Sequence, residues 1–415
     1  MIVIADDLTG AADAAAGFLK LGYSVAVAAR SDGDFSDAGR FGVFSVNTDS
    51  RELDGHDAYQ RVFEITRAFK GQMIYKKIDS IFRGNPAEEL EAVIDGANFD
   101  IAIVSSSFPE NKRTTLGGIL RASGIEIDAV SLFEGNMRRR VGLIPIDTVR
   151  RGAEAVAKYA ETEFSRGVSV FVADSETRED LATLAFAAKY MDKNILYCGS
   201  ARLAEHILEK NSDKAKSDIE LPRGKGIIVA IGSRTEVTRR QIEYANQKLD
   251  IKNIIMPVDA VLKNPETETK KYAAMAAEEL EKKGEAVICF DSLFKDFDLL
   301  AKQDDSEKAD AERIAKVLAA TVSVVREKIP VFGLITSGGD ASLAVMKVMK
   351  ADTIELIAEV SPGIPAGKMR SNTAAESEEL PVIVTKSGGF GNVEAIAESV
   401  EFLKNLMSKK EQRNG

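Results

Sequence analysis

Short glycine turns that follow apolar, strand-like runs are the stretches of this sequence most suited to binding an anion. The clearest follows Val331–Ile335, where Ser337, Gly338, Gly339 and Asp340 precede an amphipathic pattern that begins at Ala341. Glycine lets backbone N–H groups approach an anion, and a helix N-terminus offers free donors and a partial positive charge. A buried strand that ends in such a turn is therefore typical of a phosphate site in an α/β protein.

Two further stretches of the second half repeat this arrangement. Pro381–Asn392 is PVIVTKSGGFGN, and Gly226–Arg239, GIIVAIGSRTEVTR, is a weaker copy. Any one of these turns is as readily explained as an ordinary glycine-rich connection between a strand and a helix. Three of them in one half of the chain, with Lys386 beside one, indicate a nucleotide-sized anion rather than a lone phosphate.

Acidic residues follow the first apolar run of the chain. The segment Ala5–Asp13 is ADDLTGAAD, and parallel sheets bind their ligands at the carboxyl ends of strands. Asp6 and Asp7 point in roughly opposite directions in an extended chain, so we expect at most one of them to face a site. That carboxylate would hydrogen-bond a polyol, accept a hydroxyl proton or hold Mg²⁺. The alternative is an Asp/Thr arrangement that only caps the next helix.

A second charged turn, Lys76–Asn85 (KKIDSIFRGN), ends another strand-like run. Lys77, Asp79 and Arg83 combine cations with a carboxylate in one loop, which suits a small anionic substrate that bears hydroxyl groups. Arg83 offers a bidentate fork to a carboxylate, whereas Lys77 acts as a point charge. A solvated cluster of surface ions is the alternative interpretation.

Other motifs are weaker or missing. The polar stretch Ser105–Gly118, which contains Arg113, is expected to be a functional loop of the same type. The turn-rich stretch Ser361–Lys368, which contains Gly363, is expected to be a loop that shapes an adenine or ribose pocket or merely connects two elements. The sequence has neither GxxxxGK[ST] nor GxGxxG, so neither a P-loop nor a Rossmann dinucleotide site is predicted.

Composition narrows the class of protein. A chain of 415 residues predicts two domains, and its net charge of −10 argues against nucleic acid as a partner. Cys198 and Cys289 lie far apart in apolar runs, which predicts reduced core thiols. The chain opens on a strand without a basic leader, and no apolar run approaches the ~18–20 residues of a membrane span, so a cytoplasmic location is expected. With only His56 and His206 available, a His-based triad or zinc site is not expected.

Apolar runs alternate with amphipathic segments throughout, which predicts an α/β protein with two three-layer α/β/α domains and mostly parallel sheets. The charged stretch Lys210–Lys225 lacks an apolar period, and we expect domains at 1–212 and 226–415 joined by a linker at 213–225. The predicted strands are 2–5, 24–29, 42–46, 73–78, 100–104, 168–173, 194–197, 227–231, 254–258, 286–290, 331–335, 354–360 and 382–385. The clearest predicted helices are 11–21, 57–69, 86–94, 147–161, 203–208, 271–282 and 309–328.

Taken together, these stretches resemble the four-carbon acid sugar kinase family, which phosphorylates threonate-, erythronate- or oxo-tetronate-type acids with ATP. The resemblance covers nearly the whole chain. It implies a sugar-acid-binding N-terminal domain, a nucleotide-binding C-terminal domain and catalysis in the cleft between them. The motifs that carry it, in order, are ADDLTG at 5–10, K-x-D-S and R-G-N within 77–85, R-T-T-x-G-G at 113–118, SGGD at 337–340, PGIPAG at 362–367 and KSGGFG at 386–391.

The resemblance, with the turns described above, gives a set of expected site residues. We expect the sugar acid to contact Asp6, Asp7, Lys77, Asp79, Arg83 and Arg113. We expect ATP to contact Ser233, Gly338, Gly339, Asp340, Ala341, Gly363, Lys386, Gly388 and Gly389.

The sequence also departs from the family pattern. Ile81 stands where the family commonly has Thr, Ala341 follows the SGGD carboxylate where the family has Thr, and Arg202 occupies a glycine position of a GSAGLA run. The GSCS turn is GSRT in this chain. These changes bear on the identity of the acid more than on the kinase prediction.

The leading hypothesis is an ATP- and Mg²⁺-dependent kinase that phosphorylates the terminal hydroxyl of a four-carbon sugar acid. Phosphoryl transfer mainly requires positioning and charge stabilisation. Asp7 or Asp79 would accept the hydroxyl proton, Lys386 or Lys77 would offset developing charge, and Asp340 is the candidate Mg²⁺ ligand. The alternatives are a kinase for another small sugar acid or polyol, and a non-catalytic two-lobed binding or sensor protein. Neither nucleic acid nor a membrane is an expected partner, and a homo-oligomer is left open.

Overall fold

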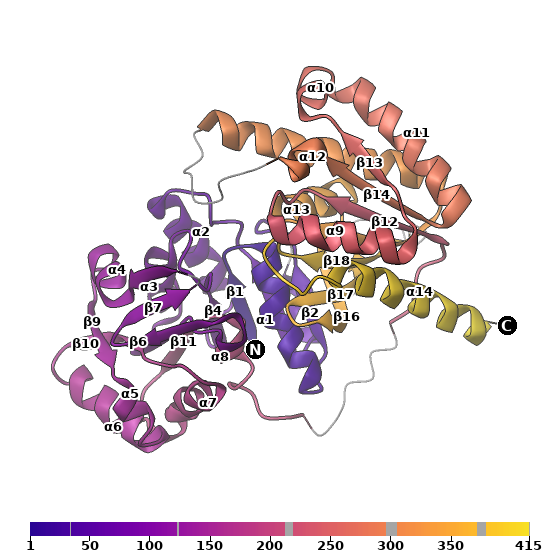
Figure 1. Ribbon diagram of the computed structural model, residues 1–415. Helices are drawn as coiled ribbons and strands as arrows, with labels where there is room; N and C mark the ends of the chain where they lie inside the picture. Colours follow the sequence, from indigo (N-terminus) through magenta and orange to yellow (C-terminus); the bar gives the residue numbers. More distant parts are fainter. Residues whose placement is uncertain (34, 123, 212–218, 296–304, 372–378, 415) are drawn as a thin grey trace. The chain divides into compact units, whose positions relative to one another are not determined.

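The computed structural model describes residues 1–33, 35–122, 124–211, 219–295, 305–371 and 379–414. The chain divides into two compact units, Met1–Ala215 and Lys216–Gly415, which Figure 1 colours from indigo to magenta and from red to yellow. Residues 213–218 of the predicted linker lie outside the described residues. From 219 to 225 the backbone forms neither helix nor strand.

The first unit is built on a fully parallel sheet. Its strands are almost entirely buried, which explains why they occur in the sequence as short continuous apolar runs. The strand order is β2 (Val25–Ala28), β3 (Val43–Asn47), β1 (Ile2–Ala5), β4 (Ile74–Lys77), β11 (Ile195–Gly199), β5 (Ile101–Ser105), β10 (Val168–Ala173) and β9 (Arg140–Ile144).

Helices cover both faces of this sheet. Ile2 and Ile4 of β1 share a core cluster with α2 (Gly55–Ala68) and α3 (Pro86–Ala97). The other face of β1 packs against α1 (Leu8–Lys20), which also contacts α8 (Ala201–Ala204). The remaining helices of the unit are α4 (Ala129–Asn136), α5 (Ile146–Val149), α6 (Ala153–Phe164) and α7 (Arg178–Phe186), with 3-10 turns η1 (Ser36–Arg40), η2 (Pro109–Asn111) and η3 (Ala187–Tyr190).

The first unit differs from the sequence predictions in several places. Strand β9 was not predicted, and the helix predicted at 203–208 is the shorter α8. The single helix expected at 147–161 is two helices, α5 and α6, because Gly152 between them has a φ of +105°. The stretch expected as a loop at 105–118 ends in strand β6 (Arg113–Leu116), which pairs with β7 (Ile119–Ala122), itself paired with β8 (Ile125–Asp128).

Gly117 and Gly118 explain this unexpected hairpin. Both have positive φ, +63° and +75°, as the two central residues of a tight hairpin turn require. The buried carboxylate of Asp174 accepts hydrogen bonds from both of their N–H groups, at 3.0 and 2.9 Å. The glycine pair of the R-T-T-x-G-G motif therefore forms a hairpin turn.

The second unit has a mixed sheet. Its strand order is β13 (Asn253–Met256), β14 (Glu285–Phe290), β12 (Gly226–Ile231), β15 (Val331–Ser337), β18 (Val382–Lys386), β17 (Ile364–Arg370) and β16 (Thr353–Ser361). In this order β17 runs opposite to the other strands and is antiparallel to both β18 and β16. The loop predicted at 361–368 is thus wrong from Ile364 onward. The turn is confined to Pro362 and Gly363, since Gly363 has a φ of +78° and Ser361 already pairs with Ile364.

Helices of the second unit also form two groups. Ile227, Val229 and Ile231 of β12 share a core cluster with α9 (Glu236–Leu249) and α14 (Ala395–Asn414). In the second group, α12 (Asp305–Lys328) contacts α11 (Pro265–Lys283), α13 (Gly339–Val348) and α10 (Val258–Lys263). This group packs against β12 through α11 and α12. The predicted α/β class with mostly parallel sheets is confirmed. None of the helices described is both long and apolar enough to cross a membrane.

Candidate functional site

The ends of five parallel strands lie in one row across the sheet of the first unit. Ala5 pairs with Asn47 on one side and Lys77 on the other, and Gly199 pairs with both Lys77 and Ser105. The residues that follow these strands therefore emerge at the same carboxyl edge. This register brings the ADDLTG turn, the KIDSIFRGN turn and the segment after β3 together.

Arg51 binds three of the carboxylates at this edge. Its guanidinium lies 2.7 Å from Asp6 (Nε–Oδ2), 2.8 Å from Asp7 (Nη1–Oδ2) and 3.8 Å from Asp79 (Nη2–Oδ2). Both Asp6 and Asp7 thus reach Arg51, contrary to the expectation that at most one of them would face a site. Sequence reasoning did not identify Arg51, which follows β3 and lies 45 positions from Asp6.

The R-G-N motif supports the loop that carries Arg51. The Asn85 side chain donates hydrogen bonds to the backbone oxygens of Ser50 (3.2 Å) and Leu53 (2.9 Å). Gly84 has a φ of +80°, and a Cβ at that position would lie 3.1 Å from Cγ of Arg51. Glycine and asparagine in this motif therefore hold Arg51 in place.

Asp7 both caps α1 and belongs to the charged cluster. Its Oδ1 accepts a hydrogen bond from the Gly10 N–H at 2.8 Å, and its Oδ2 accepts one from the Thr9 hydroxyl at 2.7 Å. A Cβ at Gly10 would lie 2.5 Å from Asp7 Oδ1 and 3.1 Å from Lys77 Nζ. Burial opposes ionisation, but Arg51 and Lys77 outweigh it and lower the pKa of Asp7. Asp7 therefore caps the helix, as the alternative interpretation of ADDLTG expected, and its carboxylate also belongs to the charged cluster.

Asp79 is paired with arginine and hydrogen-bonded to the backbone. Its Oδ2 pairs with Arg83 Nη2 at 2.6 Å, and its Oδ1 accepts the Ile81 N–H at 2.9 Å. Although burial opposes its ionisation, the guanidinium groups of Arg83 and Arg51 hold the pKa of Asp79 far below its usual range. Arg83 itself is 57% exposed. Arg113 reaches the same loop, where its guanidinium donates to the Ser80 hydroxyl.

A fully buried ion pair lies behind the cluster. Lys76 Nζ is 2.6 Å from Glu89 Oε2, and Glu89 Oε1 accepts a hydrogen bond from the Ser50 hydroxyl at 2.7 Å. Burial raises the pKa of Glu89 against the opposing charge of Lys76. Because Ser50 precedes Arg51, this pair helps to fix the guanidinium among the aspartates.

The three glycine turns of the second unit also meet at one edge. Ile231 pairs with Ser337, and Ser337 pairs with Lys386, so the turns after β12, β15 and β18 emerge side by side. A Cβ at Gly338, whose φ is +106°, would lie 3.3 Å from the Ser233 nitrogen. A Cβ at Gly388 would lie 2.3 Å from Ser233 Oγ. These glycines allow three backbone segments to approach each other closely.

The remaining predicted nucleotide contacts lie at this same edge. Ala366 of β17 pairs with Val384 in antiparallel fashion, so β17 begins beside the end of β18 and the Gly363 turn joins the edge. Gly339 begins α13, and Asp340 is exposed in its first turn. Two further predicted residues differ in exposure: Ala341 is buried and Gly389 is exposed.

Lys386 is buried among uncharged oxygens. Its ammonium donates to the backbone oxygens of Ser387 (2.8 Å), Gly388 (3.1 Å) and Phe390 (3.2 Å). Burial lowers the pKa of Lys386 to about 7. The Lys386 side chain thus holds the KSGGFG turn through three of its backbone oxygens.

No cluster of three or more His, Cys, Asp or Glu side chains suited to a metal ion occurs in the parts of the chain that the structure describes. Mg²⁺ in phosphoryl-transfer sites needs only one or two protein carboxylates, since phosphate oxygens and water supply the other ligands. Asp340, an exposed carboxylate in the first turn of α13 beside Gly338, fits that requirement.

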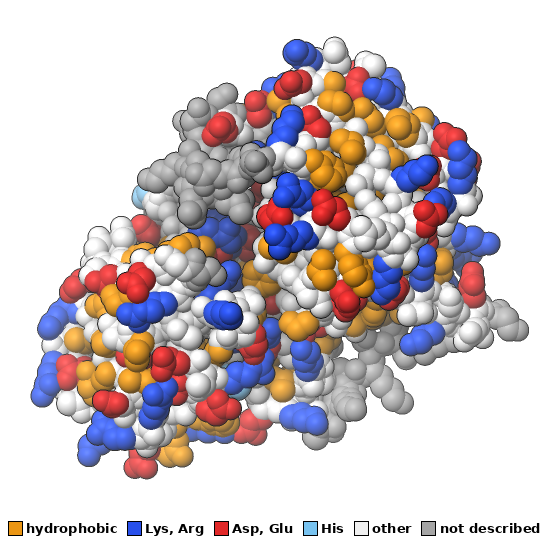
Figure 2. All heavy atoms as spheres, in the orientation of Figure 1, with side chains coloured by type: hydrophobic (Ala, Val, Ile, Leu, Met, Phe, Trp, Pro, Cys, Tyr) orange, Lys and Arg blue, Asp and Glu red, His pale blue; other side chains and the backbone are white. Residues whose placement is uncertain are grey.

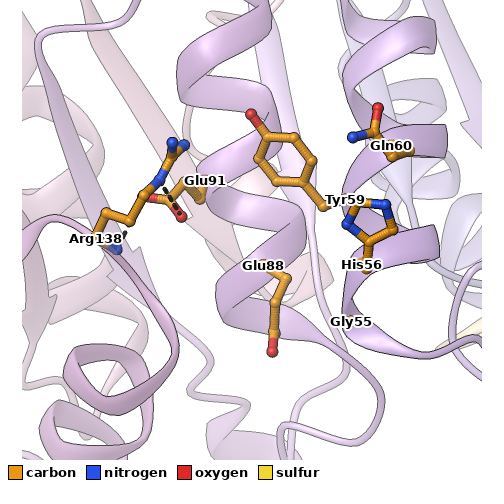
Figure 3. A pocket seen from close by; sticks show the side chains of 7 residues that line it. All are labelled: Gly55, His56, Tyr59, Gln60, Glu88, Glu91 and Arg138. Atoms are coloured by element: carbon orange, nitrogen blue, oxygen red, sulfur yellow. Dashed lines mark hydrogen bonds and ion pairs between the residues drawn. The ribbon is translucent and has the colours of Figure 1, made fainter.

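A surface pocket of about 350 Å³ lies elsewhere on the first unit, between α2 and α3 (Figure 3). It contains none of the predicted site residues. Arg138 on its wall pairs with Glu91 at 3.3 Å, as the dashed contacts in Figure 3 show. The residues that line this pocket are Gly55, His56, Tyr59, Gln60, Glu88, Glu91 and Arg138.

On the face drawn in Figure 2, acidic and basic side chains are interspersed over both units.

Family comparison divides the chain at the same place as the contacts do. Residues 1–132 and 124–207 match a sugar-binding N-terminal domain, and residues 228–396 match a nucleotide-binding C-terminal domain. The carboxylate–arginine cluster lies in the first match and the three glycine turns lie in the second.

Several curated proteins are similar to the chain over nearly its whole length. They include a D-erythronate kinase of Heliobacterium modesticaldum (28% identity, covering 97% of this chain and 97% of the relative) and a D-threonate kinase of Cupriavidus necator (27%, 95% and 96%). A 3-oxo-tetronate kinase of Burkholderia multivorans is 27% identical, with 94% of each chain covered.

Solved structures agree in fold. A protein of Salmonella typhimurium LT2 superposes with a TM-score of 0.77 at 18% identity, covering 96% of this chain and 98% of that one. A protein of Haemophilus influenzae gives a TM-score of 0.68 at 20% identity, covering 97% and 100%.

Proposed function

The chain belongs to the four-carbon acid sugar kinase family, and we propose that it transfers the γ-phosphoryl group of ATP to the terminal (C4) hydroxyl of a four-carbon sugar acid. Threonate, erythronate and 3-oxo-tetronate are the substrates to test. The observation that carries this proposal is the cluster in which Arg51 joins Asp6, Asp7 and Asp79 at one sheet edge, within the match to a sugar-binding domain.

The cluster offers complementary groups for both ends of such an acid. Oδ1 of Asp6 is buried without a hydrogen bond from any described residue, which is costly unless a ligand donates to it. A substrate hydroxyl would supply that donor. Arg83, more than half exposed beside Asp79, would bind the substrate carboxylate, for which a guanidinium fork is well matched.

The residues of the first unit would orient the acid rather than perform demanding proton chemistry. The transition state of phosphoryl transfer is loose, so the acceptor hydroxyl needs alignment more than strong deprotonation. Asp79, held ionised by Arg83 and Arg51, would accept the hydrogen bond of the reacting hydroxyl. Asp7 is the other candidate for that role, and both oxygens of each of these aspartates also accept hydrogen bonds within the protein.

The second unit would bind the triphosphate through its glycine turns. The N-terminus of α13, which begins at Gly339 and has no side-chain cap, presents backbone N–H groups and a partial positive charge, and Lys386 holds the neighbouring turn in place. Asp340 would hold Mg²⁺, which neutralises triphosphate charge when it is bound.

An ADP-release assay across threonates, erythronates and 3-oxo-tetronates tests this proposal. We expect ADP release with at least one acid, and a phosphate monoester on C4 by ³¹P-coupled NMR. Asp79→Asn should lose turnover while calorimetry still detects ATP binding. Binding of an acid without ADP release would instead favour the sensor alternative, and ester formation at another carbon would refute the C4 assignment.

A further inference from the structure

Arg202 is a buried cation that the proposed chemistry does not use. It lies in the first turn of α8, two residues after the Ser200 N-cap, and its side chain is 3% exposed. An arginine is almost never buried to this extent without partners that hold it in one place. Its partners therefore indicate what it does.

Those partners belong to the segment between β5 and β6. The guanidinium carbon of Arg202 lies 4.4 Å from the centre of the Phe108 ring, within the range of a favourable cation–π contact. Its Nη1 pairs with Glu205 on the same helical turn, and its Nε is 3.6 Å from Oε2 of Glu110. The cation thus contacts both the aromatic ring and the carboxylate of the η2 segment.

Phe108 in turn fixes the backbone of Arg113. The Phe108 N–H donates to the Arg113 oxygen at 2.8 Å, and the Arg113 N–H donates to the Phe108 oxygen at 3.1 Å. Arg113 then donates to the hydroxyl of Ser80, the neighbour of Asp79. A continuous set of contacts therefore runs from α8 to the loop that carries Asp79.

A second arginine provides an internal comparison. Arg178 contacts the same two carboxylates, Glu110 and Glu205, the latter at 3.2 Å. It is 47% exposed, and none of its described contacts is to Phe108. Glu110 and Glu205 would keep one cationic partner if either arginine were removed, so loss of Arg202 would not leave two unpaired buried charges.

We propose that Arg202 is a positioning residue for the sugar-acid site: it holds Phe108 so that Arg113 stays against Ser80 and the Asp79 loop keeps its geometry. This inference rests on the proposed function for its kinetic consequence. Its structural consequence, a more mobile 108–115 segment without Arg202, does not depend on catalysis.

The test compares Arg202→Met with Arg178→Met in the full-length protein. Hydrogen exchange should be faster by about ten-fold or more at the hydrogen-bonded amides of Phe108, Arg113 and Thr115 in Arg202→Met, and unchanged in the strands of the second unit. Arg178→Met should leave those amides near wild type. Equal exchange in the two variants, or none above wild type, would overturn the proposal.

Kinetics supply the second readout. With whichever acid the wild type phosphorylates, Arg202→Met should raise the KM for the acid by about ten-fold with the KM for ATP unchanged, and Arg202→Lys should recover part of the loss. Arg113→Met should cost little more in the Arg202→Met background, because the two residues act in series. Multiplicative effects would contradict the proposal. If the wild type phosphorylates none of the acids, the proposed function fails, and the exchange experiment still decides the role of Arg202.

Discussion

Replacing Arg51 with methionine removes a cation that pairs with Asp6, Asp7 and Asp79 and whose side chain is 16% exposed. Removing one partner of a buried ion pair costs about 3–5 kcal/mol, since the other partner stays charged and unpaired. In this cluster three carboxylates would lose their common partner. We therefore expect Arg51→Met to destabilise the first unit by about 3–5 kcal/mol at pH 7.5.

The loss should depend on pH in a defined direction. Arg51 lowers the pKa of Asp7 and of Asp79 against the effect of burial, so its contribution is present above the ordinary aspartate pKa and is lost as the pH falls through the folded values. Without Arg51 both carboxyls protonate more readily. The difference in free energy of unfolding between wild type and variant should therefore be largest near neutral pH and shrink as the pH falls below about 4.

Urea titration read out by hydrogen exchange of β1 and β4 peptides measures this free energy for the first unit alone. The matched control is Arg61→Met, which removes an arginine of the same region whose hydrogen bonds to described residues go to the backbone oxygens of Thr48 and Asp49. We expect the control to cost about 1 kcal/mol and to show no comparable pH dependence. A cost below about 1 kcal/mol for Arg51→Met, or one that does not change with pH, would refute the account of the cluster.

Three further predictions concern the second unit. Gly388→Ala places a Cβ 2.3 Å from Ser233 Oγ, whereas a Cβ at Gly389 meets nothing within 4 Å. Calorimetry should therefore show that Gly388→Ala weakens ATP binding about ten-fold or more and that Gly389→Ala weakens it little. Equal ATP affinities of the two variants would contradict the role of the turn. Lys386 has a folded pKa of about 7 against an ordinary value of 10.5, so the unfolded chain binds more protons between these values. Relative to Lys386→Met, the unfolding free energy of wild type should thus rise with pH across that window by up to about 1.4 kcal/mol per pH unit; parallel profiles would rule this out. Asp340→Asn should raise the Mg²⁺ concentration needed for half-maximal turnover while Mg²⁺-free nucleotide binding is retained, and an unaltered Mg²⁺ dependence would remove Asp340 as the ligand.

Local sequence patterns were sufficient for most of the fold. Apolar runs such as Ile2–Ala5 and Val331–Ile335 are buried on both faces of a sheet, so each appears as a strand in isolation. β6 was missed because threonine and arginine dominate its sequence, and β17 was missed because it contains a proline and a glycine. Their pairing depends on turns with positive φ at Gly118 and Gly363, which a sequence shows only as glycines.

The composition of the site was harder to predict than its location. The sequence indicates four of the site residues because each lies at the end of a strand or within two residues of it: Asp6, Asp7, Lys77 and Asp79. Parallel register then places them at one edge of the sheet. Arg51 has no such signal: it joins the cluster through a loop held by contacts from Gly84 and Asn85, more than 30 positions away. Arg202 could be noted as a departure from a family motif, but its contact with Phe108 required the tertiary structure.

Hydrogen exchange with each ligand added separately tests the central claim most directly, namely that the acid and the nucleotide bind at the two sheet edges described. The substrate acid should slow exchange in segments 5–10, 48–53 and 77–85, and a non-hydrolysable ATP analogue should slow it in 232–235, 338–342 and 386–391. Protection of one common segment by both ligands, or protection confined to other parts of the chain, would contradict the account.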